Sequence, residues 1–264
     1  MNRIDATFAK LRKAKKTAFI PFVTAGDPDL ATTEKFVLAF EQAGADIMEL
    51  GVPFSDPMAD GPTIQAASQR ALKKHINLKK ILGAVRNIRR RSQLPVALMT
   101  YYNPVFHYGL GRFVKDAKAA GVDGLVVPDL PPEEAGDLLK FSRKAGLSVV
   151  FFAAPTTTNQ RLRKVVKAAT GFVYYVSLTG VTGARKSLPA DLIKNVRRVK
   201  AATSKPVCVG FGISTPQQVK AVGAVADGVI VASAIIKEIE KNAKRRDLVP
   251  LTARYVASLA RALQ

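Results

Sequence analysis

The chain has 264 residues, of which 48% are hydrophobic, and its 41 Lys and Arg against 20 Asp and Glu give a formal net charge of +21 at pH 7. This composition supports a large core and excludes a disordered chain, and apolar runs no longer than a strand exclude a transmembrane helix. The single cysteine, Cys208, excludes an intramolecular disulfide and is typical of a reducing compartment.

The positive charge would attract nucleic acid or anionic membranes. However, the basic clusters are scattered through the chain, Trp is absent, and aromatic residues are not interleaved with them. We therefore interpret the charge as a solvated basic surface and expect neither nucleic acid nor a membrane as partner. The N-terminal segment has no apolar signal core, so we expect a cytoplasmic protein.

The first predicted element is a short amphipathic helix, because Ile4, Phe8 and Leu11 recur at helical spacing. Apolar, strand-like segments then follow at regular intervals, with amphipathic helical segments between them. They lie near residues 18–23, 46–50, 95–100, 122–127, 147–153, 172–176, 206–210 and 227–231. Most are apolar on both faces, as buried parallel strands are.

About eight strand–helix units predict a (β/α)8 TIM barrel with an extra N-terminal helix, a single domain over residues 1–264. The alternative is an open doubly wound sheet. That fold's dinucleotide fingerprint, G-x-G-x-x-G after the first strand, is missing. The glycines that precede Asp46 and Asp123, at 44 and 121, suit helix C-termini in the left-handed conformation.

An acidic segment stands out between Lys35 and Arg70, where five acidic residues occur without a Lys or Arg. Glu49 lies in a buried strand, where desolvation raises a carboxyl pKa toward neutrality and suits it to acid–base catalysis; the alternative is a structural ion pair. Asp60 is either catalytic or the N-cap of a helix that begins at Pro62. Asp56 is interpreted as a loop-stabilising or partner-contacting residue.

The predicted strand ends lack the lysine and histidine residues that other classes of enzyme use. No Lys lies there, which argues against a Schiff-base enzyme. The two histidines, His75 and His107, fall in a helix end and a loop, which argues against a histidine metal site or a Ser-His pair. The acid–base work is therefore assigned to carboxylates, with no metal.

The second half of the chain predicts a lid and a phosphate site. The long loop at 178–187 contains two glycines and two threonines. The glycines at 210 and 212 end the seventh predicted strand, and Ser233 follows the eighth at the start of a helix, where such barrels usually bind phosphate. The residues alone thus indicate a cofactor-free lyase or isomerase acting on a small phosphorylated substrate.

Six segments together resemble the tryptophan synthase alpha subunit, essentially from end to end. They are PFVTAGDPD (21–29), ELGVPFSDPMADGP (49–62), TYYNPVFHYG (100–109), VPDLPPEE (127–134), YYVSLTGVTGAR (174–185) and GFGIS (210–214). The resemblance implies retro-aldol cleavage of indole-3-glycerol phosphate to indole and glyceraldehyde 3-phosphate. Glu49 would be the general acid and base, Asp60 would hold the indole N–H, and Tyr175 would lie near the reacting carbon in a supporting role.

The resemblance also implies the substrate contacts. Thr182 would be the lid threonine that meets the aspartate on closure. The indole pocket would be lined by Phe22, Met99, Tyr101, Val126 and Phe211. The phosphate would be bound at Gly183, Gly212, Ala232 and Ser233. The family generally has glycine where this chain has Ala232, whose methyl group crowds the phosphate.

The partner implied by the resemblance is a beta subunit, in an alpha2beta2 tetramer. Pyridoxal phosphate belongs to that partner, so no cofactor is expected on this chain. Docking would use the loop at 53–60 and the segment at 103–108, with Pro53, Asp56 and Asn103 as contacts. Two alternatives stay open: a stand-alone indole-releasing lyase without a beta partner, and, on charge alone, a nucleic-acid-binding protein that has kept a barrel scaffold.

Overall fold

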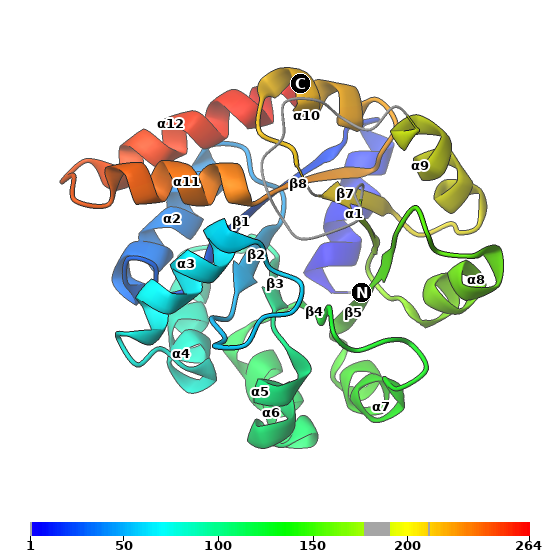
Figure 1. Cartoon of the computed structure of the whole chain (residues 1–264), viewed down its shortest axis with the longest axis horizontal. Coiled ribbons are helices and arrows are strands. Elements are labelled where there is room, and N and C mark those ends of the chain that lie inside the picture. Colours follow the sequence, from blue (N-terminus) through cyan, green and yellow to red (C-terminus); the bar gives the residue numbers. More distant parts are fainter. Residues whose placement is uncertain (1, 177–190, 211) are drawn as a thin grey trace.

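The computed structural model describes residues 2–176, 191–210 and 212–264. Its strands form a closed parallel barrel in which each strand pairs with the next and β8 pairs with β1 (Figure 1). The strands are β1 (Ala18–Thr24), β2 (Met48–Gly51), β3 (Val96–Met99), β4 (Gly124–Val126), β5 (Ser148–Ala153), β6 (Val173–Val176), β7 (Val207–Gly210) and β8 (Gly228–Val231). The predicted TIM barrel is confirmed.

Helices surround the barrel, and more of them are present than one per strand. They are α1 (Arg3–Lys13), α2 (Leu30–Gln42), α3 (Pro62–Leu72), α4 (Leu78–Arg89), α5 (Tyr102–Tyr108), α6 (Leu110–Ala120), α7 (Gly136–Ala145), α8 (Asn159–Ala168), α9 (Leu192–Ala201), α10 (Pro216–Gly223), α11 (Ser233–Asn242) and α12 (Leu248–Ala260), with a 3-10 turn, η1 (Arg261–Leu263). Two of them, α3 and α5, precede a second helix in the same connection between strands, and α11 and α12 both follow the last strand, β8. In the described part of the chain, no helix is long and apolar enough to cross a membrane.

Side chains alternate between the barrel interior and the layer under the helices, as strand geometry requires. The interior is a cluster of buried residues that includes Ile47, Val126, Tyr174 and the thiol of Cys208. The same cluster contains Ile4, Phe8 and Leu11 of α1, so the N-terminal helix closes one end of the barrel. The predicted amphipathic helix is confirmed, and the site must lie at the other end.

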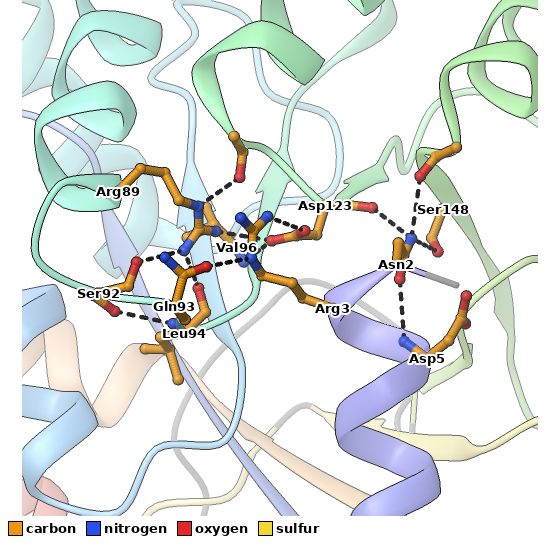
Figure 2. A network of polar contacts seen from close by, with 12 residues as sticks. Asn2, Arg3, Asp5, Arg89, Ser92, Gln93, Leu94, Val96, Asp123 and Ser148 are labelled. Carbon is orange, nitrogen blue, oxygen red and sulfur yellow. Dashed lines mark hydrogen bonds and ion pairs between the residues drawn. The ribbon is translucent and has the colours of Figure 1, made fainter.

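Polar contacts fasten α1 to the amino ends of the strands (Figure 2). Asn2 Nδ2 donates to the carbonyl of Asp123 at 3.0 Å and to Ser148 Oγ at 2.7 Å. The buried carboxylate of Asp123 accepts from Arg3 Nη1 at 3.0 Å and from Arg89 Nη2 at 2.8 Å. The carboxylate is thus neutralised where it is desolvated, and α1 is held in place by it.

The short segments that lead into β2, β4 and β8 share one hydrogen-bonding arrangement. Asp46, Asp123 and Asp227 each accept, through one carboxylate oxygen, the backbone N–H of a residue near the start of the preceding strand, at 2.8, 3.0 and 2.9 Å. Gly44 and Gly121 have φ of +99° and +95°, which confirms the predicted left-handed helix ends. These bonds fix the register of neighbouring strands and therefore the height at which inward-facing residues lie.

Candidate active site

Glu49 lies in the middle of β2, opposite Phe22 of β1 and Ala97 of β3. Strand alternation directs its side chain into the barrel, where it is 2% exposed. Burial, and then the nearby charge of Asp60, raise the pKa of Glu49 from 4.5 to about 8. Among the described residues Oε1 has no hydrogen-bond partner. Glu49 is therefore a protonated acid at neutral pH rather than half of an ion pair.

Asp60 ends the loop between β2 and α3. Gly61 is the N-cap of α3 and Pro62 occupies the first turn, so Asp60 is not the capping residue of the helix. Its backbone is held instead, because Gln65 Nε2 donates to the Asp60 carbonyl at 2.7 Å. The side chain is 5% exposed, and Oδ1 has no partner among the described residues.

Tyr101 connects Asp60 to the rest of the site. Its hydroxyl donates to the Asp60 carboxylate and accepts the backbone N–H of Ala59 at 3.0 Å. Its ring stacks on Phe54, with centroids 5.2 Å apart. Burial raises the pKa of Asp60 from 3.8 to about 6, and the Tyr101 hydrogen bond opposes that rise. Near pH 7 the site thus holds one protonated and one ionised carboxyl.

The apolar lining comes from residues adjacent in register on neighbouring strands. Phe22 lies opposite Glu49, and Met99 lies opposite both Gly51 and Val126. The Phe22 ring fills the space above Gly51, where an added Cβ would lie 2.4 Å from Phe22 Cζ. Phe22, Met99 and Val126 thus lie on β1, β3 and β4, beside or next but one to the strand of Glu49, and Tyr101 bonds to the loop that ends in Asp60. Phe211 lies outside the described residues.

The tyrosine of β6 that faces the barrel interior is Tyr174, not the predicted Tyr175. Tyr174 belongs to the interior cluster, and burial, then the charge of Glu49, raise the pKa of its hydroxyl well above the usual value. Tyr175 points to the layer under the helices, where Asp191 and Arg198 act on its pKa after burial. The placement of Tyr175 at the reacting carbon is corrected, because adjacent residues of a strand face opposite sides.

Residues predicted for phosphate come together at the ends of the neighbouring strands β7 and β8. Gly212 follows β7 with φ of +78°, which favours glycine. Ala232 is the N-cap of α11, and Ser233, 7% exposed, is its first residue. A helix N-terminus offers free N–H groups and a favourable dipole to an anion. The predicted residues Thr182 and Gly183 lie outside the described residues.

The predicted docking residues differ in exposure. Asp56 and Asn103 are exposed, whereas Pro53 is buried. Beside them two large apolar side chains that the prediction did not name are exposed, Met58 by 73% and Phe106 by 61%. Within the described ranges no group of three or more His, Cys, Asp or Glu could hold a metal ion.

Comparison with known proteins decides the family. The family model described as "Tryptophan synthase alpha chain" matches residues 8–261. The chain belongs to this family. A tryptophan synthase alpha chain from Geotalea daltonii is 54% identical over 241 residues, 91% of each chain. One from Caldanaerobacter subterraneus subsp. tengcongensis is 48% identical over 263 residues, 100% of each chain.

Solved structures agree with the family assignment. The tryptophan synthase alpha subunit of Legionella pneumophila superposes with a TM-score of 0.93 at 39% identity, covering 100% of this chain and 98% of that one. A chain from the tryptophan synthase a2b2 complex of Pyrococcus furiosus superposes with a TM-score of 0.86 at 42% identity, covering 92% of this chain and 98% of that one. As a tryptophan synthase alpha chain by family, the protein is a carbon–carbon lyase that cleaves indole-3-glycerol phosphate in tryptophan biosynthesis.

Proposed function

We propose that the chain cleaves indole-3-glycerol phosphate by a retro-aldol reaction in which Glu49 moves the protons and Asp60 holds the indole ring. The observation that carries the proposal is the difference between the two buried carboxyls. Glu49, with a pKa of about 8, starts as an acid, and Asp60, with a pKa of about 6, starts as an anion. Opposite protonation states at one pH are what a proton donor beside a cation-stabilising group requires.

The reaction starts with proton transfer from Glu49 to indole C3, which leaves a positive charge on the ring nitrogen. The Asp60 carboxylate accepts a hydrogen bond from the indole N–H and stabilises that charge. The Glu49 carboxylate then takes the proton of the side-chain hydroxyl next to the ring. The carbonyl of glyceraldehyde 3-phosphate forms, the carbon–carbon bond breaks, and its electron pair returns to the indole. Glu49 is protonated again at the end.

The pocket and the helix N-terminus bind the two ends of the substrate. Phe22, Met99, Tyr101 and Val126 offer an apolar enclosure for the indole, which also keeps Glu49 desolvated. Gly212 and the start of α11 at Ser233 offer a place for the phosphate. Ala232 still has a backbone N–H that the phosphate can bind, but its methyl group leaves less room for the phosphate to approach that N–H.

The test is an assay of indole release from indole-3-glycerol phosphate. We expect Glu49→Gln to abolish turnover, because the amide neither donates nor accepts the proton, and Asp60→Asn to lower kcat by about a hundredfold. Full activity in either variant would remove the role assigned to that residue. Tyr174→Phe and Tyr175→Phe form a matched pair on the two faces of β6. We expect a change in kcat only from Tyr174→Phe.

We also propose a tryptophan synthase beta subunit as partner, in an alpha2beta2 assembly, with the cofactor pyridoxal phosphate on the beta chain and none on this one. Support comes from the exposed Met58 and Phe106 beside Asp56 and Asn103, and from the related chain of a Pyrococcus furiosus a2b2 complex. Addition of a beta subunit should stimulate indole release. High activity alone without stimulation would favour the stand-alone lyase. A cytoplasmic location stays a prediction.

A further inference from the structure

Arg70 of α3 joins three segments around the mouth of the barrel. Its Nε and Nη2 donate to the two carboxylate oxygens of Asp27, at 2.9 and 2.8 Å, and its Nη1 donates to Glu240 Oε1 at 2.7 Å. Asp27 is 2% exposed, whereas Glu240 is 50% exposed. A two-pronged guanidinium–carboxylate pair fixes direction as well as distance. Arg70 therefore ties α3 both to the loop after β1 and to α11.

Each of these three segments continues directly into the proposed site. The loop with Asp27 follows β1, which carries Phe22. The first turn of α3 holds the Asp60 backbone through Gln65, so a shift of α3 moves Asp60. The helix α11 begins at Ser233. The helices α3 and α11 pack against each other and lie side by side in Figure 1, so the Arg70 contacts brace the elements that carry the two ends of the substrate site.

We propose that Arg70 is a positioning residue that sets the separation between Asp60 and the N-terminus of α11, and thereby the length of substrate that fits between them. The inference rests on the proposed function, since it takes the indole to lie at Asp60 and the phosphate at Ser233. Arg70 itself touches no substrate. Its contribution appears only for a ligand that occupies both ends at once, because each end keeps its own contacts when α3 and α11 move apart.

Glu240→Gln is the decisive variant. It removes the charge that joins α3 to α11 and leaves the buried pair of Arg70 and Asp27 intact, so the fold is retained. Asp247→Asn is the matched control. It also replaces an exposed carboxylate, one that pairs with Arg245 at 2.9 Å within the connection between α11 and α12; among the described residues no ion pair joins it to another helix. Arg70→Lys keeps the positive charge but cannot donate to both carboxylate oxygens of Asp27 as the guanidinium does. It therefore tests whether the two-pronged geometry matters, rather than the charge alone.

The experiment measures binding by calorimetry of two probes, glycerol 3-phosphate and the non-cleavable indole-3-propyl phosphate. We expect Glu240→Gln and Arg70→Lys to weaken the binding of indole-3-propyl phosphate at least about threefold. This is the effect that the loss of one partly exposed ion pair has on a dissociation constant. Glycerol 3-phosphate should bind as in the wild type, and Asp247→Asn should change neither probe.

Unchanged binding of indole-3-propyl phosphate in Glu240→Gln, or an equal loss for both probes, overturns the role of Arg70 while leaving the proposed function standing. Failure of the wild type to bind indole-3-propyl phosphate overturns both. A kinetic readout supports the distinction, because a positioning defect raises KM for indole-3-glycerol phosphate and lowers kcat together at unchanged thermal stability, which a purely structural role would not do.

Discussion

The raised pKa of Glu49 has a consequence for folding that is independent of turnover. Burial and the charge of Asp60 raise it from 4.5 to about 8. At about 1.4 kcal/mol per pKa unit, the ionised form is disfavoured in the folded state by about 5 kcal/mol. Below pH 4.5 Glu49 is protonated in both the folded and the unfolded state, so its ionisation does not change the free energy of unfolding. As pH rises from 4.5 to 8 only the unfolded state releases the proton, so the folded state loses stability, and above 8 the loss is constant.

Glu49→Gln removes this titration while keeping the shape of the side chain. The variant should become more stable than the wild type as pH rises, with a gap that widens by about 1.4 kcal/mol per pH unit and reaches about 5 kcal/mol above pH 8. Urea unfolding followed by circular dichroism at a series of pH values measures the gap. Glu134→Gln, at an exposed carboxyl, is the control and should show no such divergence. Parallel stability curves for wild type and Glu49→Gln would refute the reasoning.

Three further outcomes follow from the same site. The kcat/KM for indole-3-glycerol phosphate should be bell-shaped, falling below about pH 6 as Asp60 is protonated and above about pH 8 as Glu49 loses its proton; a profile flat from pH 5 to 9 would contradict both assignments. Tyr101→Phe removes a hydrogen bond that favours the ionised form of Asp60, so the acidic limb should move to higher pH; an unmoved limb in the pH–rate profile would contradict that contact. Gly51→Ala puts a methyl group 2.4 Å from Phe22 Cζ, so it should destabilise the protein by about 1–3 kcal/mol in urea unfolding and lower indole release; wild-type values for both would show that the ring has room to move.

The regular spacing of apolar segments, and the turn residues between them, were sufficient to predict the barrel. Buried parallel strands appear as apolar runs, and each predicted run overlaps an observed strand. The helix that begins at Pro62 was also predictable, because proline favours the first turn. Whether Asp60 or Gly61 caps that helix was not, since both residue types suit the position. The answer depends on where the loop places the Asp60 carboxyl, which is a tertiary property.

The tyrosines of β6 show the limit of motif matching more sharply. Tyr174 and Tyr175 are neighbours in an apolar run, and both faces of a buried strand are apolar. No periodic signal therefore indicates which ring faces the barrel interior. Register decides it, and register is fixed by contacts far along the chain, such as the Asp227 carboxylate that accepts the N–H of Val207 on β7. A one-residue error exchanges the two faces.

The charge of +21 is compatible with an acid whose pKa is about 8 because many of the basic side chains lie at helix ends away from Glu49. Every described α-helix except α2 and α12 has Lys, Arg or His in its last turn, whereas acidic residues occupy the first turn only in α1 and α7. A cation there offsets the negative end of the helix dipole by about 0.3–1 kcal/mol.

In a barrel, the helices that cross over between strands end at the amino ends of the strands, opposite the site. Most of these cations are therefore separated from Glu49 by the barrel core, and salt screens exposed charges beyond about 10 Å. Accordingly, the groups that shift the pKa of Glu49 and Asp60 include no Lys or Arg of the described chain. A cation introduced into the loop between β2 and α3, residues 52–61, would lie on the side of the site and lower the pKa of Glu49, and this loop contains no Lys or Arg.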